Sequence, residues 1–159
     1  FFNDLHAAYV IKVSKDKDSF EYCLTEHLRM SGVYWGLMAM VLMGRDVRVE
    51  MDSEALVEWV LRCQHSNGGF GGNEDHDPHV LYTLSALQIL AILGALDRID
   101  GDRVAAYVAS LQQEEGSFFG DEWGEVDTRF SYCALSALSI LGRLRKKGLI
   151  DVDRAAEFV

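Results

Sequence analysis

A few polar and aromatic side chains stand inside apolar stretches, and these are the residues whose types could do chemistry. Arg129 lies one turn into the apolar run that begins DTRFSYCALSAL. A buried guanidinium needs an acid, a carbonyl or an anionic ligand as partner. We therefore expect Arg129 either to pair with Asp127, or an acid of a neighbouring loop, or to bind an anion. The pair Tyr34-Trp35 by itself indicates core packing, because buried aromatic side chains mostly fill space.

Other groups carry weaker chemical signals. His76, Asp77 and His79 are metal-ligand types, but Asp77 is better explained as the cap of the helix that follows it, with the imidazoles solvated. The glycine-rich segment 65–76 is not a phosphate-binding loop, because no strand precedes it and no Lys-Ser/Thr pair follows. The acidic run of Asp121, Glu122 and Glu125 is typical of a solvated loop.

The three cysteines Cys23, Cys63 and Cys133 each lie in a helical, largely apolar pattern. No CxxC motif and no Cys/His spacing typical of a zinc finger is present. The sequence therefore predicts buried free thiols in a reducing compartment.

These residues are carried by three long stretches that are apolar on nearly every face. Each ends at a glycine that can adopt the left-handed conformation of a helix end, and the second and third begin at an aspartate that can cap a helix. The stretches are 27–44, 77–94 and 127–142. Three amphipathic helices follow them, over 53–64, over 102–112 and from Asp151 onward.

The remaining segments are predicted as follows. A weak amphipathic helix covers 2–10, a polar loop 12–19, a helical turn 21–26 and a plain connection 45–51. The second apolar helix, with Pro78 in its first turn, is expected to be capped by Asp77.

The pattern repeats along the chain. Leu111-Gln112 follows Cys63-Gln64 after 48 residues, and Tyr132 follows Tyr82 after 50. A helix that is apolar all round needs protein on every side. A ring of inner helices surrounded by outer ones meets that need, whereas a flat solenoid leaves one face bare. We therefore predict an all-α fold, an α/α toroid (α-α barrel) of helical hairpins with units of about 27–64, 77–112 and 127–159, here incomplete.

Composition narrows the function classes. The chain has 159 residues, 49% of them hydrophobic, and a net charge of −10. This balance argues against nucleic-acid binding and against an anionic membrane surface, which both need clustered Lys and Arg. The apolar run 80–96 is short for a membrane span and contains Thr83, Ser85 and Gln88, so we expect no transmembrane segment. Nothing resembles a signal peptide, and the expected localisation is cytoplasmic.

Longer motifs carry a specific resemblance. The repeat with an outer-helix Gln and a Gly-x-Phe loop resembles the β subunits of protein prenyltransferases. The stretches EYCLTEHLRMSGVYWGLMAMVLMG, HDPHVLYTLSALQIL and GSFFGDEWGEVDTRFSYCALSAL resemble, more narrowly, β subunits of type II protein geranylgeranyltransferases, the Rab geranylgeranyltransferases. The resemblance spans about 20–159 and identifies the chain with the N-terminal half of such a subunit.

The resemblance implies an enzyme. Members of that family pair with an α subunit and transfer geranylgeranyl from geranylgeranyl diphosphate to C-terminal cysteines of Rab GTPases presented by an escort protein. A zinc ion in the β subunit binds the acceptor thiolate and favours its ionisation.

The resemblance also implies site residues. The isoprenoid-binding positions that it carries over are Ser31, Tyr34, Trp35, Leu84, Arg129 and Tyr132. Farnesyl-transferring relatives have bulkier aromatic residues at Ser31 and Leu84, so the smaller side chains here leave room for a fourth isoprene unit. The family's zinc ligands, an Asp-x-Cys pair and a later His, fall beyond Val159. No catalytic or metal-binding residue is therefore expected in this chain, and we do not expect it to turn over substrate alone.

Three alternatives remain at this point. A terpenoid cyclase on the same barrel would need an Asp-rich motif facing the cavity, for which 74–77 is a poor candidate. A type I geranylgeranyltransferase or farnesyltransferase β subunit is the nearest competitor. Periodicity alone would equally permit a non-catalytic α/α scaffold that binds partners through its loops. An incomplete ring would leave an open apolar edge, so we also expect self-association, completion by another chain, or an origin as a piece of a larger protein.

Overall fold

The computed structural model describes residues 2–158, and all regular elements within that range are helices. Two short 3-10 turns, Glu26–Leu28 and Leu96–Arg98, accompany the α-helices. The α-helices are α1 (Asn3–Lys15), α2 (Phe20–Leu24), α3 (Arg29–Leu42), α4 (Val47–Glu50), α5 (Ser53–Arg62), α6 (Val80–Leu93), α7 (Gly101–Ser110), α8 (Arg129–Ile140) and α9 (Val152–Phe158).

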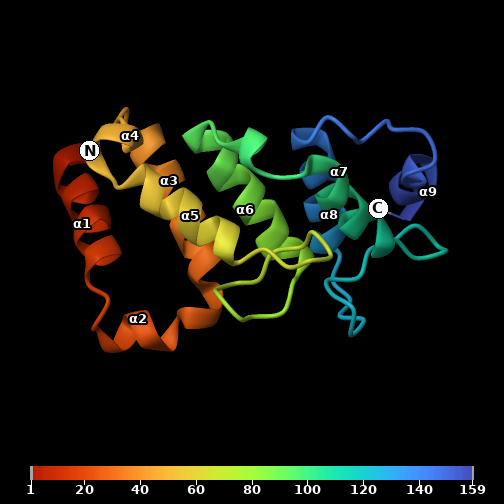
Figure 1. Ribbon diagram of the computed structural model, residues 1–159, viewed down its shortest axis with the longest axis horizontal. Helices are drawn as coiled ribbons and strands as arrows, with labels where there is room; N and C mark the ends of the chain where they lie inside the picture. The colour runs from red at the N-terminus through yellow and green to blue at the C-terminus, as the bar shows by residue number, and fades with distance from the viewer. Residues whose placement is uncertain (1, 159) are drawn as a thin grey trace.

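The helices form two layers (Figure 1). Helices α3, α6 and α8 lie side by side with α6 in the middle, while α5 packs on α6 and α7 on α8. Helix α6 has protein on three sides, from α3, α5 and α8, and eight of its residues are buried, in keeping with its apolar sequence. The predicted α/α toroid of stacked hairpins is therefore confirmed as the fold class.

The start of α6 differs from the prediction. Its cap is His79, whose ring accepts the Leu81 N–H at 3.1 Å, and Asp77 is exposed. The reason is a hydrogen bond from the His79 N–H to the Phe70 carbonyl at 3.0 Å, which holds the chain extended up to the cap. The end is as expected, with Gly94 left-handed at φ +72°.

The other differences between the predicted and the observed helix boundaries are small. Helix α1 continues to Lys15 through the expected loop, and two lysines in its last turn suit the negative end of the helix dipole. Asp46 caps the short helix α4 inside the expected connection 45–51. Asp151 caps α9 by accepting the Arg154 N–H at 3.0 Å, as expected. The expected continuation of this helix through Val159 lies outside the described residues.

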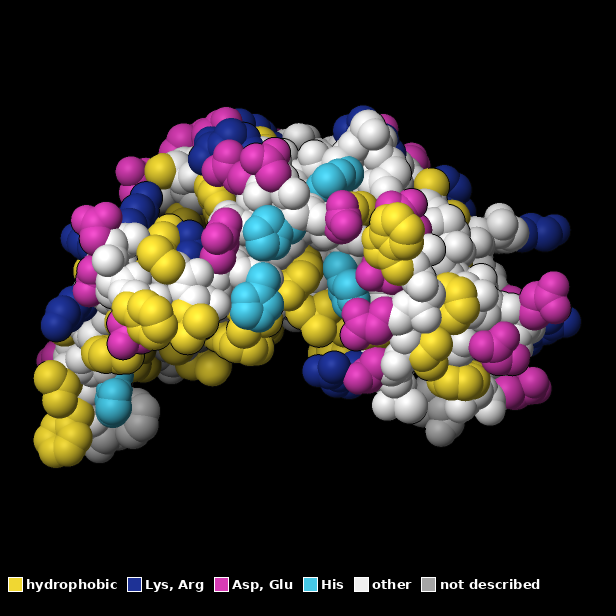
Figure 2. Space-filling model, turned by 90° about the horizontal axis from the view of Figure 1, so that it is seen from below, with side chains coloured by type: hydrophobic (Ala, Val, Ile, Leu, Met, Phe, Trp, Pro, Cys, Tyr) yellow, Lys and Arg dark blue, Asp and Glu magenta, His cyan; other side chains and the backbone are white. Residues whose placement is uncertain are grey.

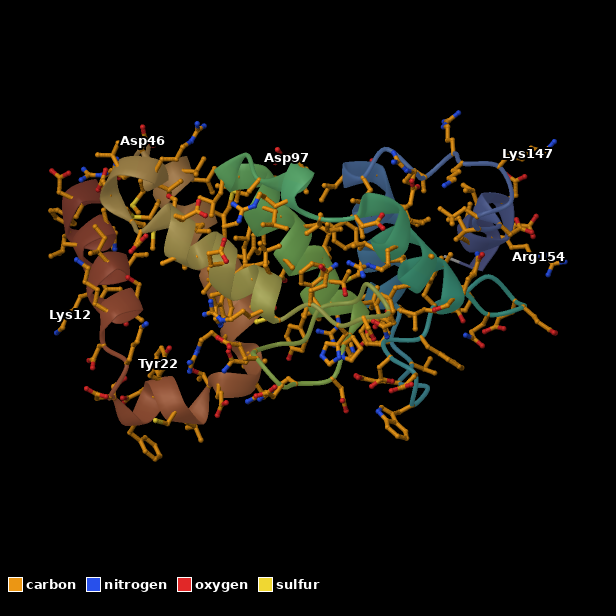
Figure 3. The ribbon with its side chains drawn as sticks, in the orientation of Figure 1. Lys12, Tyr22, Asp46, Asp97, Lys147 and Arg154 are labelled. Carbon is orange, nitrogen blue, oxygen red and sulfur yellow. The ribbon has the colours of Figure 1, made fainter. Side chains whose placement is uncertain are left out.

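The N-terminal arm, α1 and α2, packs on α3 through α1 and is also joined to it by an aromatic contact from α2. The Arg29 guanidinium lies 3.3 Å from the centre of the Tyr22 ring, and its Nη2 donates to the Tyr22 carbonyl at 2.5 Å. Tyr22 projects from α2 into the space between α1 and α3 (Figure 3). A stacked guanidinium of this kind stabilises the arm through cation–π attraction.

The loops after α5 and α7 have the same structure in both repeats. The Gly71 N–H donates to the Cys63 carbonyl at 3.0 Å, and 48 residues later the Phe119 N–H donates to the Leu111 carbonyl at 3.0 Å. Each loop inserts one phenylalanine, Phe70 or Phe118, which is essentially fully buried. The repeat read from the sequence is thus a structural repeat.

Candidate functional site

The face of α3, α6 and α8 that α5 and α7 leave uncovered is called the inner face below. The molecule is arched, and hydrophobic side chains gather along the hollow side of the arch (Figure 2). The largest exposed side chains of α3 and α8 are Trp35 and Tyr132, at 64% and 66% exposure. Trp35 and Leu42 on α3 lie seven residues apart and are both exposed, so they share one side of the helix, and Leu28, seven residues before Trp35, is exposed at its start.

The predicted chain-length residues lie deeper. Ser31 and Leu84 are 3% and 5% exposed, within the contact between α3 and α6. Ser85 donates to the Leu81 carbonyl at 3.1 Å, so the 3.2 Å bond between the two serine hydroxyls runs from Ser31 to Ser85. Tyr34 is half-buried. Of the predicted residues, Trp35 and Tyr132 are thus exposed to solvent. Ser31 and Leu84 are buried, and their size affects how closely α3 and α6 approach.

Arg129 pairs with Asp127, one of the two partners expected from the sequence. Its Nε and Nη2 donate to the two carboxylate oxygens at 2.9 and 2.8 Å, and its N–H donates to the same carboxylate at 2.8 Å. Hydrogen bonds from Arg129 lower the pKa of the Asp127 carboxyl. The expectation of a buried guanidinium is wrong, because Arg129 is the first residue of α8 and its side chain is 67% exposed.

A second polar group lies at the start of α6, between two repeats. The His79 ring contacts the Glu125 carboxylate at 3.0 Å and packs edge-on against Phe130, with ring centres 5.0 Å apart. The Val80 N–H donates to the Gly120 carbonyl at 2.7 Å. His79 therefore holds the 120–125 loop against the end of the inner layer. Sequence reasoning missed this contact, because its partners are 46 residues apart and share no motif.

His79, Asp121 and Glu125 form the one group of metal-ligand side chains that converges within residues 2–158. The hydrogen bonds of His79 count against a metal there. Its Nδ1 accepts the Leu81 N–H, so the neutral ring carries its proton on Nε2 and donates it to Glu125. A metal ion at Nε2 would leave the neutral ring with its proton on Nδ1, where it would face the Leu81 N–H instead of accepting it. The group fits a proton-bearing imidazole and does not fit zinc.

The thiols are not arranged as nucleophiles. Burial raises the pKa of Cys63 to about 12 and that of Cys133 to about 11, so both stay protonated at neutral pH. Cys23 is exposed, which corrects the expectation of three buried thiols; it lies on the short arm helix α2, where no second layer covers it.

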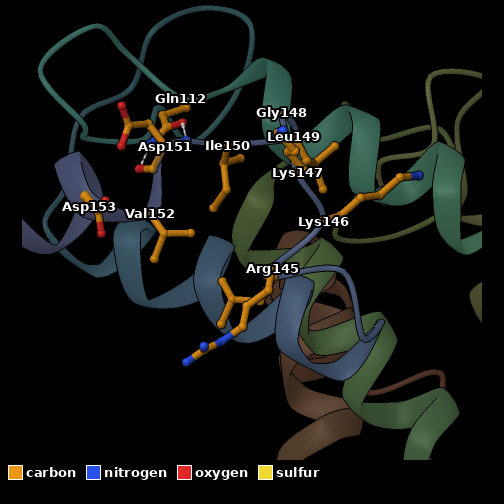
Figure 4. A pocket seen from close by; sticks show the side chains of 11 residues that line it. Gln112, Arg145, Lys146, Lys147, Gly148, Leu149, Ile150, Asp151, Val152 and Asp153 are labelled. Carbon is orange, nitrogen blue, oxygen red and sulfur yellow. Dashed lines mark hydrogen bonds between the residues drawn. The ribbon is translucent and has the colours of Figure 1, made fainter.

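A shallow hollow of about 520 Å³ lies beside the segment that joins α8 to α9 (Figure 4). At its end Gln112 exchanges two hydrogen bonds of 2.8 Å with the backbone of Asp151. Gln112 thus anchors the next hairpin, whereas its counterpart Gln64 donates to the Gly68 carbonyl within its own loop at 3.3 Å.

Comparison with known proteins agrees with this geometry. A family model described as the prenyltransferase alpha-alpha toroid domain matches residues 1–159. The chain belongs to the prenyltransferase α-α toroid family. The exposed aromatic residues on the inner face of this toroid are therefore the candidate site.

The toroid resembles named relatives at the level of sequence. It is 52% identical over 87 residues to the "Probable geranylgeranyl transferase type-2 subunit beta" of Dictyostelium discoideum, covering 55% of this chain and 25% of that protein. It is 49% identical over 88 residues to "Geranylgeranyl transferase type-2 subunit beta 1" of Arabidopsis thaliana, covering 55% and 27%. Identity to the "Protein farnesyltransferase subunit beta" of Arabidopsis thaliana is 32% over 116 residues, covering 63% and 23%. The resemblance to type II β subunits is confirmed.

One solved structure shows the same fold. The Candida albicans protein geranylgeranyltransferase-I complexed with GGPP superposes with a TM-score of 0.71 at 21% identity, over 82% of this chain and 39% of that one. The toroid described here thus spans well under half of the proteins it matches. Within its described residues no helix is long and apolar enough to cross a membrane.

Proposed function

We propose that the protein is a β subunit of a heterodimeric type II protein geranylgeranyltransferase. In this proposal the enzyme transfers geranylgeranyl from geranylgeranyl diphosphate to C-terminal cysteines of Rab GTPases, forming a thioether. The partners are a prenyltransferase α subunit and a Rab presented by an escort protein, in the cytoplasm. The observation that carries the proposal is the 52% identity to a type II β subunit, against 32% to a farnesyltransferase β subunit.

The proposed role of these residues is to hold the lipid. Trp35 and Tyr132 offer large, rigid apolar surfaces on the inner face, which suit an isoprenoid chain. Ser31 and Leu84 would limit the depth of that surface from inside the contact between α3 and α6. Arg129 contributes less charge than its type implies, because Asp127 already neutralises it.

Zinc belongs to the proposal as a cofactor of the whole enzyme, where it would favour ionisation of the acceptor thiol. The residues described here do not fit it, since the one converging group of ligand types among residues 2–158 contains no cysteine and its His79 carries a proton on Nε2. The proposal therefore assigns the zinc ligands to other parts of the enzyme.

A transfer assay tests the proposal. The full-length protein, co-expressed with its α subunit, should transfer labelled geranylgeranyl to a Rab with its escort protein. Transfer of farnesyl should be at least about tenfold slower, a difference of about 1.4 kcal/mol in transition-state free energy. A preference for farnesyl, or transfer to a short C-terminal peptide without escort protein, would contradict the type II assignment.

The inner-face role is tested separately. Trp35→Ala and Tyr132→Ala should each raise the Kd for geranylgeranyl diphosphate about tenfold, because each removes a large apolar surface that the bound isoprenoid would cover. Trp123→Ala is the control, since this residue is 76% exposed in the acidic loop. Equal effects of all three substitutions would remove the inner face from the proposal.

A further inference from the structure

The outer layer contains a second hollow, away from the inner face. It lies between α7 and the loop that follows it, has a volume of about 550 Å³, and is called the α7 corner below. Its charged and hydroxyl-bearing lining comes from Tyr107 and Ser110 on α7 and from Asp121 and Glu122 on the loop, and the amides of Asn67 and Gln113 complete the polar lining. The function proposed above makes no use of these side chains.

One side chain of the α7 corner, Tyr107, lacks a hydrogen-bond partner among residues 2–158. The residue is 6% exposed, and its hydroxyl finds no hydrogen-bond partner within the described part of the chain. Buried polar groups are nearly always paired, so an unpaired one needs an explanation. Burial first, and then the carboxylates of Asp121 and Glu122, raise the pKa of Tyr107, so the hydroxyl keeps its proton.

The first repeat shows the same corner in a completed form. There Trp59 Nε1 donates to the side-chain oxygen of Asn73 at 3.1 Å. Beside it, the Arg62 guanidinium pairs with the Glu74 carboxylate at 3.0 Å. Both loop side chains thus have a donor from the outer helix, and one of those donors is a guanidinium.

The second repeat keeps the acceptors and loses that donor. The two repeats can be compared residue by residue at an offset of 48, because their matching loop hydrogen bonds have that offset. At this spacing Tyr107 replaces Trp59, Asp121 replaces Asn73, Glu122 replaces Glu74 and Ser110 replaces Arg62. The corner therefore gains a negative charge and loses a positive one.

The remaining groups do not make up for this loss. The Ser110 hydroxyl donates to the Tyr107 carbonyl at 2.7 Å. One oxygen of Asp121 accepts the N–H groups of Trp123 and Glu125 at 3.0 and 3.3 Å. Glu122 is exposed and has no ion pair among residues 2–158. The Asn67 and Gln113 amides carry no charge, so two carboxylates and a tyrosine hydroxyl line a hollow to which residues 2–158 contribute no cationic side chain.

We propose that the α7 corner binds an external guanidinium group, the side chain of an arginine on a protein partner, in the place that Arg62 occupies in the first repeat. The planar guanidinium pairs with Glu122 and donates to the unpaired Tyr107 oxygen. A guanidinium fits better than an ammonium because its forked donors reach two acceptors at once.

A titration with matched ligands tests the proposal. N-acetyl-arginine amide, added to the 15N-labelled chain, should give saturable amide shifts at residues 107–122. N-acetyl-citrulline amide has nearly the same shape without the charge, and should bind at least about fivefold more weakly. A pentapeptide with a central arginine separates the sources: tighter binding than the single residue supports a protein partner, and equal binding restricts the site to small guanidino compounds. Equal shifts with citrulline would overturn the proposal.

Two substitutions in the α7 corner test whether the binding occurs there. Ser110→Arg supplies the guanidinium from α7 itself, as Arg62 does from α5, and should abolish the titration. Glu122→Gln should weaken binding about fivefold or more, whereas Glu74→Gln, the matched change in the first repeat, should leave it unchanged. If Ser110→Arg does not fold, Glu122→Gln decides alone. Binding that is unaffected by Glu122→Gln would overturn the proposal.

Discussion

At the residue scale, His79 decides how two repeats meet. One ring nitrogen caps α6 and the other contacts Glu125, and the ring edge packs on Phe130. Gly120 has no side chain where His79 needs the space: a Cβ on Gly120 would lie 2.4 Å from His79 Nε2. The sequence points to Asp77 as the cap because aspartate is the commoner residue there. The backbone bond to Phe70, which cannot be read from the sequence, excludes it.

Substitutions at these two positions should therefore differ. His79→Ala removes the cap and the contact with Glu125, and should lower the free energy of unfolding by about 1–2 kcal/mol. His79→Asn keeps a capping oxygen and should recover part of that loss. Asp77→Ala should change stability by less than about 0.5 kcal/mol, as is usual at exposed sites. Urea unfolding followed by circular dichroism measures all three, and an Asp77→Ala loss as large as that of His79→Ala would contradict the assignment.

The thiols give a second residue-scale prediction. At pH 8 a thiol reagent such as DTNB should modify Cys23 quickly and leave Cys63 and Cys133 unmodified until the chain unfolds. The folded pKa values of about 12 and about 11 lie above the ordinary value of 9.0. Ionisation of these thiols therefore leaves the free energy of unfolding unchanged below pH 9 and lowers it as pH rises from 9 towards 12, because the unfolded chain releases these protons first. Rapid reaction of more than one thiol in the folded chain would contradict the burial of these residues.

At the element scale, the long helices could be predicted and the short ones could not. The inner helices were predicted because an all-round apolar run of helical length with a terminal glycine has few other structures available. The short helix α4 was missed because four residues show no periodicity. Of the candidate site, the pairing of Arg129 with its neighbour Asp127 was predicted. The burial of Ser31 was not, since it depends on contact with Ser85, 54 residues away.

Two glycines with positive φ allow the contact between α9 and the loop after α7 to be tested. Gly94 ends α6 at φ +72° with open space where a Cβ would be, so Gly94→Ala should cost only backbone strain, about 1 kcal/mol. Gly116 has φ +101°, and a Cβ there would lie within hard contact of the Arg154 carbonyl in α9. Gly116→Ala should therefore cost at least about 3 kcal/mol or displace α9. Thermal unfolding compares the two, and equal losses would show that α9 is not docked on this loop.

At the scale of the whole molecule, the arch leaves one apolar face open. Outer helices cover the far side of α6 and α8, while Trp35, Leu42 and Tyr132 remain exposed at 64–79% on the inner helices. Apolar surfaces of this kind are uncommon on monomers in water. The net charge of −10 opposes association over long distances, but it is screened beyond about 8 Å at physiological salt. Contact between apolar surfaces should therefore dominate.

We accordingly expect this chain alone to self-associate through the inner face. Trp35→Ser with Leu42→Ser should shift sedimentation velocity profiles towards the monomer at equal protein concentration, because each change removes about 1.5–3 kcal/mol of burial per contact. Trp123→Ser and Val49→Ser provide the matched control, since these side chains are 76% and 80% exposed but lie on the loop after α7 and on α4. If the control pair disperses the assemblies equally well, the inner face is not the contact. If the unmodified chain is a stable monomer, the open face of a toroid is a poor description of this surface.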